Sequence, residues 1–290
     1  MLTRQDFEGR ERPTWCPGCG NFGILNAIKM ALVEHQIAPH EIVIVSGIGC
    51  GSKLPFYMKV TGYNTLHGRP VAVATGIRLA QHGLHVMVVH GDGDGYGEGL
   101  SHFLNAARRN LDIVDLIQDN RIYGLTKGQY SPTSEQGKRT PSSPEGAIDR
   151  PVEPLSLAIS AGATFVARGY SGDLKHLAWL IGEALMHRGY ALVDVLQPCV
   201  TWNRGTAYDF YNPRVYRLED TPGYDPTDRA AAWEKAQEWG ERIPIGIVYR
   251  GEALPTYEDQ VPTLRAGPLV ARPLERLTPA QIEALRAELV

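Results

Sequence analysis

A run of glycines between an apolar segment and an amphipathic segment most constrains the fold of this chain. Residues 86–90 form a short apolar run typical of a buried strand, and residues 91–99 contain five glycines. The next segment places apolar side chains at helical spacing, namely Leu100, Phe103, Leu104 and Ala107. Strand, glycine loop and helix are the layout of a phosphate-binding turn, whose backbone N–H groups face the anion. The sequence therefore predicts an α/β protein with an anion site at a strand end.

Acidic residues within this loop change the kind of site that it predicts. They interrupt the glycine pattern of a dinucleotide-binding turn, and the Gly-Lys-Ser/Thr of a P-loop is absent. Carboxylates beside a phosphate require a cation, so we expect Asp92 to hold Mg²⁺ and Mg²⁺ to hold a diphosphate. Asn120 lies 28 residues after Asp92, beyond the next predicted strand, which places the two on neighbouring strand ends. Thiamine diphosphate enzymes use this pattern; the alternative is a tight turn with a solvated aspartate.

Four cysteines form a second constellation. Cys16 and Cys19 share a Cys-x-x-Cys turn, whereas Cys50 and Cys199 each follow a predicted strand. Because ligands gather at the carboxyl ends of parallel strands, the four thiols are candidates for one metal centre. Disulfides are not expected without an export signal, and scattered structural thiols are the remaining alternative. Zinc and a [4Fe–4S] cluster both take four thiolates, so the ligands leave the metal open.

Charge and hydropathy argue against two classes of function. With 29 Lys plus Arg against 32 Asp plus Glu, the formal charge is −3, which argues against a nucleic-acid binder that depends on a basic face. No apolar stretch approaches the roughly 18 residues of a membrane-spanning helix, and the first residues lack the apolar region of a signal peptide. We therefore expect a soluble, cytoplasmic protein.

Strand and helix patterns alternate as far as about residue 205. We expect strands at residues 42–45, 71–74, 86–90, 113–117 and 191–196. They predict an α/β fold with a mostly parallel sheet and helices on both faces; the family resemblance described below implies that this is a thiamine diphosphate-binding fold. This domain is assigned to residues 1–210.

Residues 211–290 are assigned to an extended C-terminal arm that prolines interrupt. We expect helices near 227–240 and 279–289, and packing on the domain or on a partner subunit. The stretch 130–154 is rich in Ser, Thr, Pro and Gly and is too long for a simple connection. It is expected to be a mobile lid or a partner-facing loop, with plain surface irregularity as the alternative.

The two constellations together resemble one family, the β subunits of the 2-oxoacid:ferredoxin oxidoreductases. The matching blocks follow the family order at residues 15–23, 46–50, 66–69, 91–94, 120–129, 165–170, 194–199 and 239–246. The longest block reads Asn-Arg-Ile-Tyr-Gly-Leu-Thr-Lys-Gly-Gln at 120–129, and the resemblance covers about residues 15–250.

This resemblance implies roles for individual residues. Cys16, Cys19, Cys50 and Cys199 resemble the four ligands of a [4Fe–4S] cluster. The side chains of Asp92 and Asn120 and the backbone carbonyl of Ile122 resemble the Mg²⁺ ligands. The implied thiamine diphosphate contacts are Ile48, Gly49, Cys50, Gly51, His67, Gly91, Asp92, Gly93, Asp94, Asn120, Ile122, Gly124 and Leu125. His67 and Lys127 are the candidate catalytic residues, Lys127 as a cation for a substrate carboxylate; each could instead be structural or merely solvated.

The resemblance also implies an activity and partners. The family decarboxylates a 2-oxoacid oxidatively, transfers the acyl group to coenzyme A and passes the electrons through the cluster to ferredoxin. Reduced ferredoxin can drive the reverse carboxylation. One glycine-loop unit is half of a thiamine site, so an α subunit is implied, paired as (αβ)₂. We expect 2-oxoglutarate as substrate, with pyruvate or a branched-chain 2-oxoacid as alternatives. The rival classes are a non-redox thiamine diphosphate decarboxylase or synthase and a zinc-stabilised binding module.

Overall fold

Apolar, largely β-branched segments pair to form one sheet at the centre of the molecule. The computed structural model describes residues 1–272 and 277–288. The sheet has eight strands in the order β2-β1-β3-β4-β6-β5-β8-β7, and every pair is parallel except the antiparallel β5 and β8. The strands are β1 (Ile42–Ser46), β2 (Thr61–Asn64), β3 (His85–Gly91), β4 (Val114–Asp119), β5 (Phe165–Tyr170), β6 (Ala191–Leu196), β7 (Val215–Arg217) and β8 (Ile243–Arg250).

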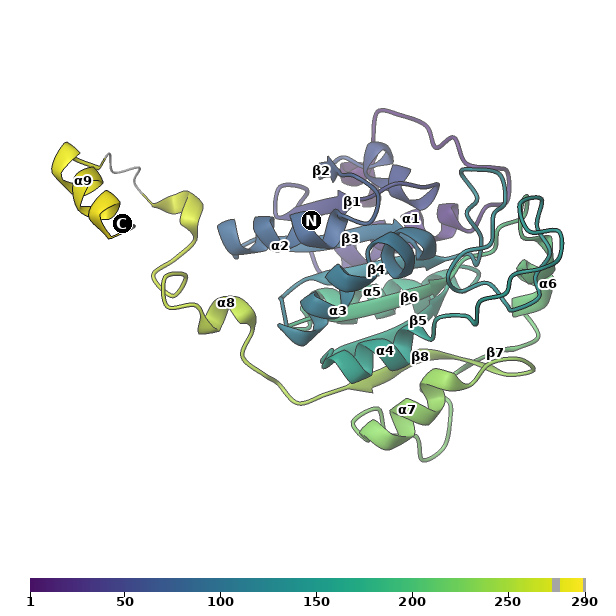
Figure 1. Cartoon of the computed structure of the whole chain (residues 1–290). Coiled ribbons are helices and arrows are strands. Elements are labelled where there is room, and N and C mark those ends of the chain that lie inside the picture. The colour runs from purple at the N-terminus through teal and green to yellow at the C-terminus, as the bar shows by residue number, and fades with distance from the viewer. Residues whose placement is uncertain (273–276, 289–290) are drawn as a thin grey trace.

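Helices cover both faces of the sheet, as Figure 1 shows. The α-helices are α1 (Asn21–Glu34), α2 (Pro70–Ala80), α3 (Leu100–Arg108), α4 (Pro154–Ala161), α5 (Leu174–Met186), α6 (Tyr208–Tyr211), α7 (Arg229–Gln237), α8 (Tyr257–Gln260) and α9 (Pro279–Ala287). The short 3₁₀-helices are η1 (Arg4–Phe7), η2 (Gly51–Tyr57), η4 (Arg204–Thr206) and η5 (Leu269–Ala271), and η3 (Gly93–Glu98) is a short π-helix.

Alternate residues of the strands pack into two separate hydrophobic cores, one on each face of the sheet. On one face, Ile42, Ile44, Met87 and Val89 pack with residues of α1 and α5. On the other face, Val43, Val45, Val86 and Val88 pack with residues of α2, α3, α4 and α7. Since successive side chains of a strand point to opposite faces, strands that are apolar at every position belong in the middle of such a sandwich. The predicted fold class, an α/β fold with a mostly parallel sheet and helices on both faces, is therefore confirmed.

The strands predicted at 42–45, 86–90, 113–117 and 191–196 appear as β1, β3, β4 and β6. The strand predicted at 71–74 is wrong, because these residues lie in α2. Pro70 occupies the start of that helix, where a missing N–H costs nothing. Val71 and Ala74 then fall one turn apart on its buried face. Four alternating small apolar residues fit either structure, and the period alone could not decide.

The region after residue 210 contributes more to the sheet than its sequence suggests. β8 pairs with β5, and β7 pairs with β8. A third apolar cluster joins them to the domain and contains Tyr170, Leu196, Tyr211, Ile243 and Ile245. The helices predicted near 227–240 and 279–289 correspond to α7 and α9, although residues 289–290 lie outside the described residues. Beyond β8 the chain leaves the sheet, and α9 stands apart from it (Figure 1). A division near residue 210 remains a proposal.

None of the helices in the described ranges combines the length and apolar character that a bilayer-spanning segment needs.

The buried strand β8, which lies between β5 and β7, should contribute more to stability than the distal arm. Ile245 is buried in β8, whereas Ile282 on α9 is largely exposed. We expect Ile245→Ala to lower the free energy of unfolding by about 2–5 kcal/mol, because it leaves a cavity. The matched change Ile282→Ala should stay within about 0.5 kcal/mol. Urea unfolding of both variants measures the difference; equal losses would contradict the role of β8.

Candidate functional site

Loops that leave the carboxyl ends of β1, β3, β4 and β6 meet at one edge of the sheet. In parallel sheets this edge is where ligands bind, because several chain segments change direction there together. β3 and β4 pair with Gly91 opposite Gln118, so Asp92 and Asn120 follow on neighbouring strand ends. The structure thus places on neighbouring strand ends the two residues whose spacing predicted a magnesium site.

The Asp94 carboxylate, in the segment after β3, holds the loop after β1 and the loop between β2 and α2 in place. Its Oδ1 accepts hydrogen bonds from the backbone N–H groups of Ile48 (2.9 Å) and Gly68 (3.0 Å). The same oxygen lies 2.5 Å from Nδ1 of His67, and Oδ2 lies 2.9 Å from Nδ1 of His90. The Asp94 side chain is fully buried, whereas 38% of the His67 side chain is exposed. Asp94 therefore holds the loop after β1 and the His67 loop against β3, with one edge of His67 left open.

A chain of buried polar groups continues from Asp94 into the core. His90 contacts Asp115 through Nε2 at 2.7 Å, and the Tyr190 hydroxyl donates to Asp115 at 2.6 Å. Burial alone would lower the pKa of His90, but Asp115 and Asp94 outweigh burial and raise that pKa to about 10. Burial has the opposite effect on Asp94 and raises its pKa. The hydrogen bond and charge of His90 outweigh burial and hold the pKa of Asp94 at about 2. The His90 imidazolium thus lies between two carboxylates.

Asp92 shares a hydroxyl donor with a second buried carboxylate. Oγ1 of Thr133 lies 2.7 Å from Oδ2 of Asp92 and 2.7 Å from Oδ1 of Asp119. A hydroxyl has a single proton, so it can donate to one of these oxygens at a time. Burial and the neighbouring Asp119 raise the pKa of Asp92 to about 7. Two close carboxylates with one donor between them are a pair that a divalent cation would stabilise.

The Asn120 turn follows from its local sequence. Oδ1 of Asn120 accepts a hydrogen bond from the N–H of Ile122 at 3.1 Å, the closure of an Asx turn. Arg121 between them has φ of +57°, a left-handed conformation. The Asn120 backbone carbonyl accepts from Nδ2 of Asn203 at 2.8 Å. The turn holds the Asn120 amide beside the backbone of Ile122, where the resemblance expects the oxygen ligands of Mg²⁺.

All four cysteines line one cavity of about 180 Å³. A Cβ added to Gly124 would lie 3.7 Å from Sγ of Cys50 and 3.9 Å from Sγ of Cys199, so these sulfurs are near neighbours. Burial raises the pKa of Cys19 to about 12, and the other three thiols act in the same direction. Across residues 1–272 and 277–288, no three His, Cys, Asp or Glu side chains converge as ligands of a single ion.

Short backbone contacts bring the distant cysteines together. The N–H of Cys19 donates to the Cys16 carbonyl at 3.0 Å and closes the Cys-x-x-Cys turn, in which Gly18 has φ of +81°. The N–H of Gly20 donates to the Pro198 carbonyl at 3.2 Å and joins this turn to the Cys199 loop. Trp15, which directly precedes Cys16, donates through Nε1 to the Cys50 carbonyl at 2.7 Å. These contacts tie the segments that hold Cys16, Cys19, Cys50 and Cys199 to one another.

The remaining predicted cofactor contacts surround the same edge. Ile48 and Leu125 are 40% and 45% exposed. Gly93 lies under Tyr123, since a Cβ there would come within 2.1 Å of the tyrosine ring. Lys127 is exposed and has φ of +78°, at the tip of the turn that follows Gly124. Gly49 lies in the loop after β1, Gly51 begins η2, and Gly91 ends β3.

Sequence reasoning missed three residues of this region: Thr133, Lys138 and Asn203. Thr133 and Lys138 belong to the stretch 130–154, which carried no strand or helix pattern, and Asn203 follows Cys199 without a motif of its own. Their roles arise from contacts distant in sequence, such as the bond from Asn203 to Asn120. Local periodicity holds no signal for them.

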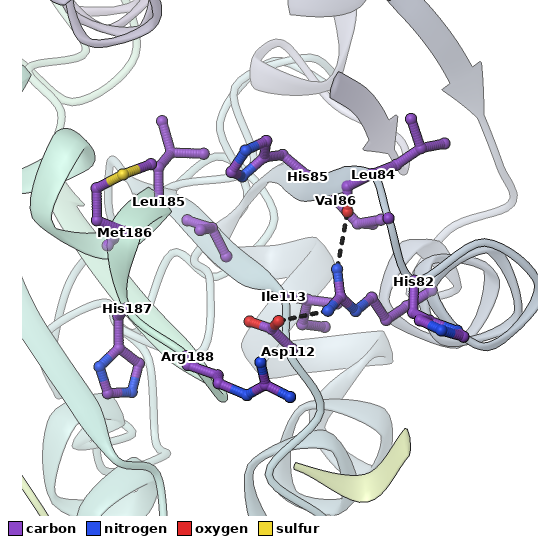
Figure 2. A pocket seen from close by; sticks show the side chains of 14 residues that line it. His82, Leu84, His85, Val86, Asp112, Ile113, Leu185, Met186, His187 and Arg188 are labelled. Carbon is purple, nitrogen blue, oxygen red and sulfur yellow. Dashed lines mark hydrogen bonds and ion pairs between the residues drawn. The ribbon is translucent and has the colours of Figure 1, made fainter. Parts of the chain in front are cut away.

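A cavity of about 300 Å³ at the opposite edge of the sheet does not share these features. Figure 2 shows Asp112, His187 and Arg188 around it, and Arg78 is another of its lining residues. Arg78 donates to the Leu84 carbonyl and to Asp112, and it also pairs with Glu258 of α8. Burial, with the charge of Arg250, lowers the pKa of His187 to about 4. Arg78 therefore fastens α8 to the amino-terminal ends of β3 and β4.

Two known families match parts of the chain. Residues 47–195 match the family described as thiamine pyrophosphate enzyme, C-terminal TPP binding domain. Residues 199–266 match the family that describes the C-terminal part of the pyruvate ferredoxin oxidoreductase beta subunit.

Individual relatives agree with both families. The chain is 49% identical over 258 residues to a 2-oxoacid:ferredoxin oxidoreductase subunit beta of Sulfolobus sp, with 85% of each chain covered. It is 48% identical over 202 residues to the 2-oxoglutarate oxidoreductase subunit KorB of Mycobacterium tuberculosis, covering 70% of this chain and 54% of that one. Among solved structures it resembles the 2-oxoglutarate:ferredoxin oxidoreductase of Magnetococcus marinus, with a TM-score of 0.89, 37% identity, and 98% and 96% of the two chains covered.

The buried His90 predicts how stability depends on pH. Its pKa is raised from the ordinary 6.5 to about 10, so its stabilising effect is complete below about pH 6.5 and is lost as pH rises toward 10. We expect the difference in free energy of unfolding between the wild type and His90→Gln to shrink over that range. Urea unfolding at a series of pH values measures this; a constant difference would contradict the charged state of His90.

Proposed function

The chain belongs to the 2-oxoacid:ferredoxin oxidoreductase β-subunit family, and on this basis we propose its activity in detail. Together with an α subunit it oxidatively decarboxylates a 2-oxoacid, with 2-oxoglutarate as the first candidate. The products are an acyl-coenzyme A and CO₂, and two electrons pass through a [4Fe–4S] cluster to ferredoxin. With reduced ferredoxin, the same site catalyses the reductive carboxylation.

One observation carries this proposal: a single turn serves both sites. Asp94 binds the backbone of Ile48, and two residues later Cys50 lines the cysteine cavity. A cofactor that contacts Ile48, Gly49 and Gly51 would therefore lie directly beside the cysteine cavity. A thiamine enzyme without redox chemistry has no need of these four thiols, and a zinc-binding module has no need of the Asp92 site.

Thiamine diphosphate, held through Mg²⁺, fits the residues at the end of β3. Asp92, the Asn120 side chain and the Ile122 carbonyl would hold the cation, because they supply the oxygen donors that Mg²⁺ prefers. Gly91 would let the diphosphate approach the backbone closely, whereas the missing side chain of Gly93 makes room for the Tyr123 ring. When bound, the cofactor supplies the electron sink that allows CO₂ to leave a 2-oxoacid. His67 would lie near its reactive end, oriented by Asp94.

A [4Fe–4S] cluster fits the thiols better than zinc does. Zinc–sulfur bonds of about 2.3 Å require thiolates to converge on one point. In the described ranges no three such side chains converge in this way, yet all four thiols line one cavity. A cluster binds each thiolate through a different iron and so accepts wider spacing. Burial, and after it the other three thiols, raise the pKa of Cys19, and positive irons would favour its thiolate. When bound, the cluster accepts single electrons.

The α subunit would complete the site. Thiamine enzymes need a glutamate beside the aminopyrimidine ring on a second domain, and the resemblance assigns that glutamate, with much of the coenzyme A site, to the α subunit. Several large apolar side chains near the site are exposed, namely Ile48, Leu66, Leu125 and Trp202. Exposed apolar surface of this kind marks a protein interface. Two αβ units would then pair as (αβ)₂.

The names of two relatives bear on the choice of substrate. The Magnetococcus marinus protein has 2-oxoglutarate, coenzyme A and succinyl-CoA bound, whereas the Sulfolobus protein is named for 2-oxoacids in general. We therefore propose 2-oxoglutarate first, with pyruvate and branched-chain 2-oxoacids as alternatives. Lys127, exposed on the turn beside Leu125, would bind a carboxylate of the substrate.

The proposed activity requires both subunits. The chain purified without oxygen together with its α subunit should reduce ferredoxin when given 2-oxoglutarate and coenzyme A, with two electrons delivered for each CO₂ released. The chain alone should be inactive, because it holds half of the thiamine site. An assay of CO₂ and reduced ferredoxin against a panel of 2-oxoacids tests both points. Oxidative decarboxylation by the chain alone would refute the proposal.

Lys127 can be tested separately. We expect Lys127→Met to raise the KM for 2-oxoglutarate about tenfold or more with little change in kcat, because a charge-assisted hydrogen bond contributes about 1.5–3 kcal/mol. Lys175→Met, which removes an exposed lysine on α5, is the matched control and should leave KM unchanged. An unchanged KM in Lys127→Met would show that this lysine is merely solvated.

A further inference from the structure

The loop that contains Lys138 is fixed over the candidate site. Thr133, at the start of this loop, binds Asp92, and Oγ of Ser134 donates to the Arg121 carbonyl at 2.7 Å. Within the loop, the N–H of Ala147 donates to the Lys138 carbonyl at 2.9 Å. The backbone at Lys138 is therefore anchored both to the Asp92 region and to the opposite arm of its own loop.

The ammonium group of Lys138 is also held in place. Its Nζ donates to Oδ1 of Asn203. Asn203 is fixed at two further points, because its Nδ2 donates to the Asn120 carbonyl at 2.8 Å and its backbone N–H donates to the Cys199 carbonyl at 3.1 Å. Asn203 thus joins the turn of a cluster cysteine to the turn of a magnesium ligand, and Lys138 binds at that junction.

Lys138 lies within electrostatic range of both the cysteine cavity and Asp92. Burial lowers the pKa of Lys138, and Arg121 acts in the same direction. Glu135, Cys199 and Asp92 act in the opposite direction. The same cation therefore acts on a thiol of the cysteine cavity and on the carboxylate at the end of β3. Lys138 is partly buried, where charges interact more strongly than at a fully solvated surface.

We propose that Lys138 is a positioning residue for electron transfer: a fixed positive charge that raises the reduction potential of the cluster bound by Cys199. This inference rests on the proposed function, since it requires a [4Fe–4S] cluster at the four cysteines. Reduction adds a negative charge to the cluster, and a nearby cation stabilises the reduced form more than the oxidised form. A higher potential favours movement of electrons away from the cofactor and onto the cluster.

The test is a redox titration of the αβ complex, purified without oxygen and monitored by the electron paramagnetic resonance of the reduced cluster. Lys138→Gln removes the charge and keeps a side chain that can bind Asn203, whereas Lys138→Arg keeps the charge. Arg139→Gln is the matched control, because it removes an exposed cation from the next position of the same loop. We expect a more negative midpoint potential in Lys138→Gln, and wild-type values in Lys138→Arg and Arg139→Gln.

Each other outcome refutes a defined part of the proposal. A wild-type potential in Lys138→Gln, in a complex that carries the cluster, would refute the role of Lys138 and leave the proposed function intact. An equal shift in Arg139→Gln would refute it too, because any nearby surface charge would then suffice. A wild-type complex that carries no iron–sulfur cluster would refute the proposed function itself, and this inference with it.

Discussion

The Asp94 carboxylate is the interaction on which the geometry of the site depends. It is buried and holds the backbone of Ile48 and Gly68 as well as the His67 ring. A buried carboxylate is stable only where donors and a positive charge compensate it. His90 supplies the charge, and Asp115, which accepts a hydrogen bond from Tyr190, holds His90 from the core side. The buried contacts of Asp94 therefore fix the relative position of three loops from separate parts of the sequence.

This arrangement explains why the two constellations of the sequence belong to one site. The β1 loop that Asp94 holds at Ile48 continues to Cys50, whose carbonyl binds Trp15 next to the Cys-x-x-Cys turn. The Cys199 loop is joined to that turn through Pro198 and Gly20, and to the Asn120 turn through Asn203. A cofactor and a cluster bound here would be neighbours without any further movement of the chain. A partner that covers the exposed apolar residues around them would exclude water from both.

Much of this site could be predicted from sequence, because its chemistry resides in short motifs at strand ends. The spacing of Asp92 and Asn120 and the positions of the four cysteines needed no long-range information. Thr133, Lys138 and Asn203 could not be found in this way, since each acts through contacts between distant segments. The same limit applies to the fold. β2 has four exposed residues, and β8 contains Pro244 and Gly246, so neither shows the apolar alternation of a strand until its partner is known. The strand predicted at residues 71–74 was wrong for the opposite reason, because the apolar pattern of these residues fits a helix equally well.

The proposed function requires that the four cysteines hold an iron–sulfur cluster beside a thiamine site. The most direct measurement is the metal and acid-labile sulfide content of the αβ complex purified without oxygen, together with its visible absorbance. We predict the iron and sulfide of one [4Fe–4S] cluster for each chain, and a broad band near ~400 nm that dithionite bleaches. A colourless complex that contains one zinc ion for each chain and no labile sulfide would contradict the claim.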